Sequence, residues 1–451
     1  MAVTLEHPES TGSAPASEEL SSRAAAEAYV GGVCFKLGPP TLIGAELEWL
    51  TVQGECSASG PTAAPRPRLA ALAAALGPYA PRSIAPDSTA LPLPGGSRVT
   101  MEPGGQIELS SAPFATAAEL CERLSEDAGL LTELLGSRSI RVISASADAD
   151  RHPERVLRLP RYRAMEQCFG GIGPFGKLMM CNTAATQVSV DAGADAAQVA
   201  ARWTATHVIG PALLAAFACS PVLRGAPAGA WASQRMRTWL RLDNSRARPP
   251  AEDWSDPIAS YARWALDVPL LCVRRPDGSA NGSVANGSVA NGSVANGSGD
   301  NWSAPPCATF ADWLGGALDD EIGRRPGLAD LDYHLTTLFP PVRASGHLEI
   351  RYIDAQPEDV WAVPVHAVDA LLSTPEIVAE ATALAAPLTG RWLDAARQGL
   401  ADSQIREIAA DILALAAAHA ATPAAATQLE TAARRCRASL TPSGERAGAS
   451  S

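Results

Sequence analysis

Residues 41–52 read TLIGAELEWLTV, and the alternation of apolar and polar side chains in this stretch decides the fold class. A β-strand has a side-chain period of two, so Glu46 and Glu48 share one face while Ala45 and Leu47 share the other. Two carboxylates two residues apart on one face repel each other unless a cation lies between them. The segment therefore predicts a strand with one face in the core and an acidic face, on which a cation would relieve the repulsion.

Three further segments alternate in the same way. Their polar faces are Gln106, Glu108 and Ser110 in GGQIELSS (104–111), Thr183, Gln187, Ser189 and Asp191 in CNTAATQVSVD (181–191), and His347, Glu349 and Arg351 in GHLEIRYID (346–354). An ordinary antiparallel sheet with one wet face would explain any single strand. As a set, however, these faces repeat carboxylates and contain no lysine. Mg²⁺ prefers carboxylate and phosphate oxygens, so adjacent strands predict a trough for two or more Mg²⁺ ions and a nucleoside triphosphate.

Helical patterns surround these strands. Residues 116–135 begin with Thr116 and Glu119, the spacing of a capping box. Residues 194–219 read as an Ala-rich helix interrupted near Pro211. Four helices are predicted toward the C-terminus, over 375–384, 388–399, 402–420 and 423–439. Strands carry the candidate site while helices crowd the C-terminus, which predicts an α+β fold and not a βαβ alternation.

The domain organisation follows from length and composition. A chain of 451 residues with 47% hydrophobic residues suits one large domain, which we place at residues 21–440. Residues 1–20 and 441–451 are polar and are expected to be disordered. Residues 278–299 repeat Ser-Val-Ala-Asn-Gly and predict a flexible surface insertion.

Charge and cysteine usage exclude several classes of partner. The net charge of −12 disfavours nucleic acid and anionic membrane surfaces. The longest apolar run, residues 207–223, is broken by Gly210 and Pro211 and is short for a membrane span. Nine scattered cysteines without a CxxC pair, and a polar acidic N-terminus, predict free thiols in the cytoplasm.

Residues 171–177 read GIGPFGK, which resembles a phosphate-binding P-loop. The next residue is Leu178, where the motif needs a Ser or Thr to hold Mg²⁺. A glycine-rich loop near the site is the better interpretation, and Lys177 remains a candidate phosphate contact. The chain has no HExxH and no GxSxG motif, which leaves little support for zinc or for a covalent hydrolase.

Eight segments, in order, make the sequence similar to a known family. They are GAELEWL, MEPGGQIELSSAP, PRYRAM, CNTAATQVSVD, SQRMRTWLRLDNSR, YARWALDVPL, HLTTLFPPVR and HLEIRYIDAQP, and together they span about residues 41–372. The chain resembles the glutamate–cysteine ligases of the plant-like type, and its composition favours the actinobacterial branch. The resemblance implies a fold like the catalytic half of glutamine synthetase, in which a curved, mainly antiparallel sheet forms an active-site funnel with helices packed outside.

The resemblance also implies roles for individual residues. Glu46, Glu48, Glu108 and Glu349 match the family's Mg²⁺ ligands, and Arg351 matches the arginine directed at the γ-phosphate. Arg235 matches the arginine for the carboxylate of the substrate glutamate, and Arg163 is a second candidate for that task. Gln187 occupies a strand position where some relatives carry a metal-binding histidine. Glu102, in the EPGGQ turn, is a further candidate either for metal binding or for holding the turn.

The implied reaction joins L-glutamate to L-cysteine with ATP and Mg²⁺. ATP phosphorylates the side-chain carboxylate of glutamate, and the amine of cysteine then displaces phosphate to give γ-glutamylcysteine, which the resemblance links to ergothioneine synthesis. The chemistry depends on positioning and charge neutralisation more than on a covalent nucleophile. Two alternatives remain: a carboxylate–amine ligase with another amine acceptor, and a non-catalytic homologue that binds glutamate or a nucleotide.

Overall fold

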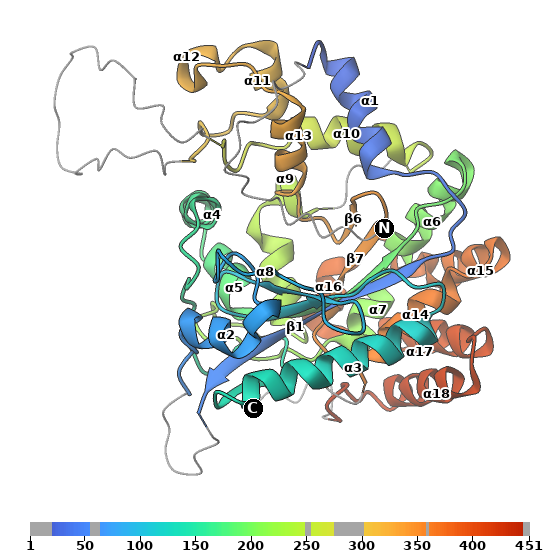
Figure 1. Cartoon of the computed structure of the whole chain (residues 1–451). Helices are drawn as coiled ribbons and strands as arrows, with labels where there is room; N and C mark the ends of the chain where they lie inside the picture. Colours follow the sequence, from blue (N-terminus) through green and yellow to red (C-terminus); the bar gives the residue numbers. More distant parts are fainter. Residues whose placement is uncertain (1–19, 55–63, 249–253, 275–301, 358–359, 445–451) are drawn as a thin grey trace.

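The computed structural model describes residues 20–54, 64–248, 254–274, 302–357 and 360–444. Most of the predicted disordered N-terminus, the whole 278–299 repeat and residues 445–451 of the tail lie outside these ranges. Within them, one antiparallel sheet divides the helices into two groups, one on each side (Figure 1).

The sheet contains the four predicted strands and three that the sequence reasoning did not identify. In spatial order its main path is β2 (Arg98–Met101), β3 (Ile107–Ser110), β1 (Ile43–Gln53), β5 (Ala185–Val190), β7 (Leu348–Asp354) and β6 (Val342–Ala344). The short β4 (Ile140–Ile143) pairs with the second half of β1. Each of these pairings is antiparallel.

The register places the polar residues of neighbouring strands opposite one another. Glu108 on β3 is opposite Glu48 on β1. Glu46 on β1 is opposite Gln187 on β5. On β7, Glu349 is opposite Arg343 of β6. Because residues opposite each other share a face, one side of the sheet carries a continuous polar surface, as the alternation predicted.

The other face of the sheet is apolar and packs on helices. Leu47, Leu109, Val188 and Ile350 are each no more than 2% exposed and belong to the main hydrophobic core. Helices α3 (Ala117–Gly136), α7 (Gly210–Phe217) and α14 (Ala362–Leu371) contact β1, β7 and β5, respectively. In Figure 1 α3, α14, α17 (Ser403–Ala418) and α18 (Pro423–Arg437) lie below the sheet. The apolar face is therefore the core side, and the polar face is left for the cavity.

The helices on the polar side include α4 (Pro160–Ile172), α5 (Phe175–Asn182), α8 (Gln234–Leu242) and α13 (Leu328–Leu335). The other helices are α1 (Arg23–Cys34), α2 (Leu69–Leu76), α6 (Ala196–Val208), α9 (Asn244–Ala247), α10 (Pro257–Asp267), α11 (Phe310–Gly315), α12 (Asp319–Ile322), α15 (Pro375–Ala385) and α16 (Trp392–Gln398). Three short 3-10 helices are η1 (Gly77–Tyr79), η2 (Ala386–Leu388) and η3 (Gly399–Ala401).

These elements confirm the predicted α+β class, with a mainly antiparallel sheet and a helical C-terminus. Thr116 caps α3 and its side chain accepts from the backbone N–H of Glu119. The predicted 194–219 helix is two helices, α6 and α7, with Pro211 in the first turn of the second. In the part of the chain that the structure describes, no helix is both long enough and apolar enough to cross a membrane.

Candidate active site

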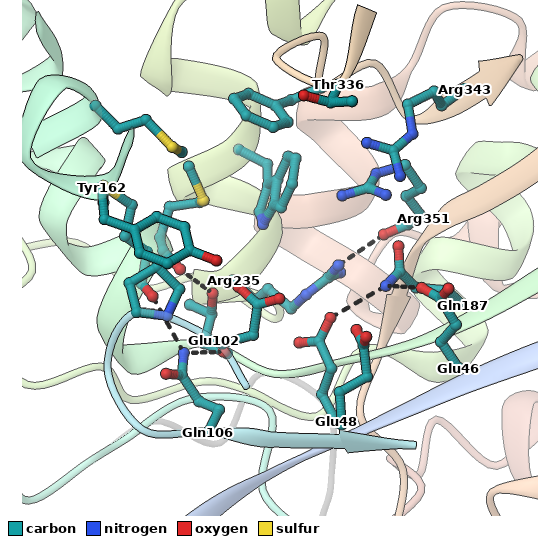
Figure 2. Close-up of a pocket in the computed structure, with 18 of the residues that line it drawn as sticks. Glu46, Glu48, Glu102, Gln106, Tyr162, Gln187, Arg235, Thr336, Arg343 and Arg351 are labelled. Atoms are coloured by element: carbon teal, nitrogen blue, oxygen red, sulfur yellow. Dashed lines mark hydrogen bonds between the residues drawn. The ribbon is translucent and has the colours of Figure 1, made fainter. Parts of the chain in front are cut away.

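A cavity of about 200 Å³ lies over the polar face of the sheet (Figure 2). Its floor comes from the strands and the turn before β3, and its walls come from α4, α5, α8 and the segments around β6. The side chains that line it include Glu46, Glu48, Glu102, Gln106, Glu108, Arg161, Tyr162, Gln187, Arg235, Trp239, Arg343 and Arg351. The site therefore combines residues from seven of the eight segments that define the sequence resemblance.

The EPGGQ turn places Glu102 in this cavity. The backbone N–H of Gly105 donates to the carbonyl of Glu102, and the N–H of Glu102 donates to the carbonyl of Gln106, each at 2.9 Å. Gly105 has φ of +86°, which favours glycine, and a Cβ at Gly104 would lie 2.2 Å from the carbonyl oxygen of Cys181. Both glycines are thus required for a turn that packs directly on the end of α5.

The amide of Gln187 links the two carboxylates of β1. Its Nε2 donates to Glu46 at 2.9 Å and to Glu48 at 3.1 Å. Glu46 also accepts from the hydroxyl of Ser110, and Glu48 accepts from the backbone N–H of Ala185. Carboxylates only accept hydrogen bonds, so the Gln187 NH₂ must face them. Its Oε1 then points elsewhere and is buried without a hydrogen-bond partner.

Two arginines enclose Glu349 at the other end of the polar surface. Arg343 donates to both oxygens of Glu349, at 2.8 and 3.0 Å, and Arg351 also donates to Glu349. Burial alone would raise the pKa of Glu349, but Arg343 and Arg351 outweigh it and lower the pKa to about 2. Glu349 is 2% exposed and is not among the residues that line the cavity, whereas both arginines are. In this structure Glu349 holds the two arginines toward the cavity.

The remaining carboxylates lack such a cationic partner, and their pKa values move in the opposite direction. Burial, with a contribution from the charge of Glu349, raises the pKa of Glu46 to about 7. Burial and the charge of Glu102 raise the pKa of Glu48 to about 8. The pKa of Glu108 is raised well above its ordinary value by burial and by its three acidic neighbours. Ionisation of this cluster is therefore unfavourable in the metal-free fold, and a bound cation would favour it.

These carboxylates have the chemistry that a magnesium site needs. The described residues include no three His, Cys, Asp or Glu side chains close enough together to hold a metal ion. Mg²⁺ commonly takes only one or two carboxylates and completes its octahedron with water and phosphate oxygens. The raised pKa values of the clustered carboxylates therefore fit Mg²⁺ that arrives with a phosphate ligand.

The raised pKa values predict how stability depends on pH. Between pH 4.5 and about 8 the folded protein keeps protons on Glu46 and Glu48 that the unfolded chain has already released. The stability that these two carboxyl groups contribute therefore falls as pH rises through this range. We expect the metal-free protein, in EDTA, to have a lower Tm at pH 8 than at pH 6, and Mg²⁺ with a nucleotide to reduce the difference. A Tm that rises over this interval would contradict the assignment.

The structure brings most of the sequence-predicted residues together. Glu46, Glu48, Glu102, Glu108, Gln187, Arg235 and Arg351 all line the cavity. Arg163 and Lys177 do not. Arg163 is exposed on the outer side of α4, and Lys177 pairs with Glu166 at 2.9 Å. The GIGPFGK segment covers the end of α4 and the start of α5, not a phosphate-binding loop after a strand.

Sequence reasoning missed Arg161, Tyr162, Trp239 and Arg343 as site residues. Arg161 and Tyr162 belong to the same PRYRAM motif as Arg163, but a helix presents successive residues 100° apart, so only some of the motif can face the cavity. Arg343 belongs to a strand of three residues that is too short to show alternation. Its VRA sequence follows two prolines.

Comparison with known proteins shows the family of the chain. A family model described as "Glutamate-cysteine ligase family 2(GCS2)" matches residues 42–448. The chain is 36% identical over 406 residues to "Glutamate--cysteine ligase EgtA" of Mycolicibacterium smegmatis, covering 89% of this chain and 86% of that protein. It is 38% identical to the Mycobacterium tuberculosis protein of the same name, covering 72% and 71%, respectively.

More distant relatives also carry the name glutamate–cysteine ligase. The chloroplastic glutamate–cysteine ligase of Nicotiana tabacum is 29% identical over 58% of this chain and 46% of its own length. A solved glutamate–cysteine ligase from Francisella tularensis, in complex with AMP, has a TM-score of 0.47 at 12% identity, over 90% of this chain and 84% of that one. This structural likeness is too low to bear on function. The family model and the two mycobacterial relatives decide the matter: the chain belongs to glutamate–cysteine ligase family 2.

Proposed function

We propose that this protein joins the side-chain carboxylate of L-glutamate to the amine of L-cysteine, using ATP and Mg²⁺, and forms γ-glutamylcysteine through a γ-glutamyl phosphate. We further propose that residues 21–440 act as one catalytic domain and that the product supplies ergothioneine synthesis. The observation that carries the proposal is the meeting of several buried carboxylates and of arginines in one cavity of a chain that belongs to this family.

The acidic side of the cavity would hold the metal. Glu46, Glu48 and Glu108 would bind Mg²⁺, with Glu102 beside them. Glu349 was expected as a fourth ligand; its pairing with two arginines supports instead a role in orienting Arg343 and Arg351. Bound Mg²⁺ would neutralise phosphate charge and so let a carboxylate approach the triphosphate.

The arginines on the basic side of the cavity would bind the transferred phosphoryl group and the substrate glutamate. Arg351 lines the cavity and presents a planar guanidinium, which would bind an oxygen of the transferred phosphoryl group. Arg235 is held by the backbone carbonyl of Arg351 at 2.7 Å and would bind a carboxylate of glutamate. These positions bring the two reactants together without a covalent enzyme intermediate.

The PRYRAM motif contains two arginines, Arg161 and Arg163, of which only Arg161 lines the cavity. Substitution of each one tests whether only the cavity-lining arginine affects substrate binding. Arg161 lines the cavity, is held by both the hydroxyl and the carbonyl of Thr336, and lies 5.1 Å from the ring of Tyr333. Arg163 lies two residues away on the exposed side. We expect Arg161→Ala to raise the KM of a substrate about tenfold or more and Arg163→Ala to leave every KM within about twofold. Steady-state kinetics with each substrate varied in turn would measure these KM values. Equal changes in the two variants would contradict the conclusion that only Arg161 faces the cavity.

The reaction itself is tested with purified protein, ATP, Mg²⁺, glutamate and a panel of amino-acid acceptors. ADP release that requires both glutamate and cysteine, with γ-glutamylcysteine identified by mass spectrometry, is the expected result. ADP release that follows another amine would favour a ligase with a different acceptor. If no pairing of substrates produced ADP, the protein would be a non-catalytic homologue and the proposal would fail.

A further inference from the structure

A buried carboxylate outside the cavity connects the end of β7 with the first turn of α8. Asp354 is 1% exposed. Its Oδ2 accepts from the hydroxyl of Ser220 at 2.7 Å and from the backbone N–H of Cys219 at 3.0 Å. Its Oδ1 accepts from the hydroxyl of Ser233 at 2.8 Å. Both carboxylate oxygens are therefore held by donors from the segments that precede α8.

The same two serines organise the start of α8. Ser233 is the N-cap residue, and its hydroxyl also accepts from the backbone N–H of Met236 at 3.0 Å. The hydroxyl of Ser220 lies 3.3 Å from the backbone nitrogen of Arg235, which donates to it. Both serines are no more than 2% exposed. The position of the first helical turn, and of the Arg235 backbone within it, is thus fixed by hydrogen bonds that converge on Asp354.

Asp354 also supplies charge to the Arg235 side chain. The distance from Arg235 Nη1 to Asp354 Oδ1 is 3.9 Å, and the guanidinium is 2% exposed. Burial lowers the pKa of Arg235, while the charges of Asp354 and Glu48 oppose that effect. Glu48 belongs to the proposed metal site, so bound Mg²⁺ would neutralise its charge. Asp354 would then remain as the negatively charged neighbour of Arg235.

Figure 2 shows the result of this arrangement: Arg235 extends from α8 into the cavity and bonds to the main chain of Arg351. We propose that Asp354 is a positioning residue of the ligase. It acts through Arg235, by fixing the first turn of α8 and by balancing the guanidinium charge, and so sets the affinity for glutamate. Asp354 itself does not line the cavity, so its role is one of positioning and not of direct contact with substrate. The inference rests on the proposed function, in which Arg235 binds a glutamate carboxylate.

The test is a double-mutant cycle on the full chain, with Asp354→Asn, Arg235→Ala and the double variant. Asparagine keeps the size of the side chain but brings an NH₂ group against hydrogen-bond donors and removes the charge. We expect Asp354→Asn to raise the KM for glutamate about 10-fold or more, as loss of a residue that orients a binding group typically does. The KM for ATP and for cysteine should change less than about threefold. In the Arg235→Ala background the same change should add nothing further.

Asp127→Asn is the matched control. Asp127 is also 1% exposed and accepts from two backbone N–H groups, of Gly95 and Ser97, at 2.7 and 2.9 Å, but it lies outside the cavity lining. We expect this variant to lower Tm and to leave the KM for glutamate unchanged. If Asp354 served stability alone, both variants would have a lower Tm and an unchanged KM for glutamate.

The outcomes separate this inference from the proposed function. Suppose that wild-type protein makes γ-glutamylcysteine. If Asp354→Asn then leaves the KM for glutamate unchanged, or raises it further in the Arg235→Ala background, the positioning role is wrong and the proposed function stands. If wild-type protein makes no γ-glutamylcysteine, the proposed function itself fails. Should Asp354→Asn not fold, Ser220→Ala takes its place: a rise of about threefold or more in the KM for glutamate is expected, and an unchanged KM overturns the inference.

Discussion

Replacing Arg351 by alanine is expected to lower kcat by about 10²–10³, equivalent to about 3–4 kcal/mol of transition-state stabilisation, while the protein stays folded. The Arg351 side chain lines the cavity, and its guanidinium lies 5.1 Å from the centroid of the Trp239 ring. A donor held in this way acts on charge that develops during phosphoryl transfer. Folding should survive, because Arg343 still pairs with both oxygens of Glu349 when Arg351 is gone.

A second arginine that also pairs with a carboxylate and lies over a tryptophan ring provides the control for this variant. Arg324 pairs with both oxygens of Asp330 at 2.6 and 2.7 Å and lies 4.9 Å from the ring of Trp313, but it does not line the cavity. We expect Arg324→Ala to leave kcat unchanged. The measurement is ADP release at saturating glutamate, cysteine and ATP, with circular dichroism to confirm folding. Wild-type turnover by Arg351→Ala would show that Arg351 has no part in the transfer.

The strands that carry the site could be predicted from the sequence because their pattern is strong. In the segment of β1, alternation holds from Ala45 to Trp49, and a one-residue shift would move Glu46 and Glu48 into the apolar core. The register between strands could not be read from any single segment. Only the structure shows that Glu48 is opposite Glu108 and that Glu46 is opposite Gln187.

Residues on short strands and on helices were the ones that sequence reasoning misplaced or missed. The resemblance offers Arg163 as a contact for the glutamate carboxylate, and the glycine-rich GIGPFGK segment offers Lys177 as a phosphate contact, yet the rotation of each helix decides which side chain faces the cavity. Glu349 was grouped with the other glutamates because it has the same strand period. What distinguishes it is Arg343, which comes from β6 and pairs with it across the sheet. Motifs thus indicated which segments line the cavity, and tertiary contacts support the role proposed for each residue.

Glu46→Gln is expected to change activity and stability in opposite directions. The hydrogen-bond partners of Glu46 are the neutral side chains of Ser110 and Gln187, and burial raises its pKa to about 7. At pH 8 a charged Glu46 therefore destabilises the metal-free fold, and a neutral amide of the same size relieves that cost. We expect Tm in EDTA to rise by about 2 °C or more. Loss of a Mg²⁺ ligand should at the same time lower kcat by about 10²–10³.

Glu166→Gln is the control, because Glu166 is a carboxylate that has cationic partners. It accepts from Arg155 at 2.6 Å and pairs with Lys177 at 2.9 Å, and these two groups lower its pKa despite the opposing effect of burial. Neutralising Glu166 should leave Tm unchanged or lower it, and kcat should be unaffected. Thermal melts with EDTA, and with Mg²⁺ and ATP, would separate the two cases, since only Glu46→Gln should lose the stabilisation that Mg²⁺ confers. If Glu46→Gln lowered Tm in EDTA and kept full activity, Glu46 would be a structural residue, and the acidic side of the cavity would not be a metal site.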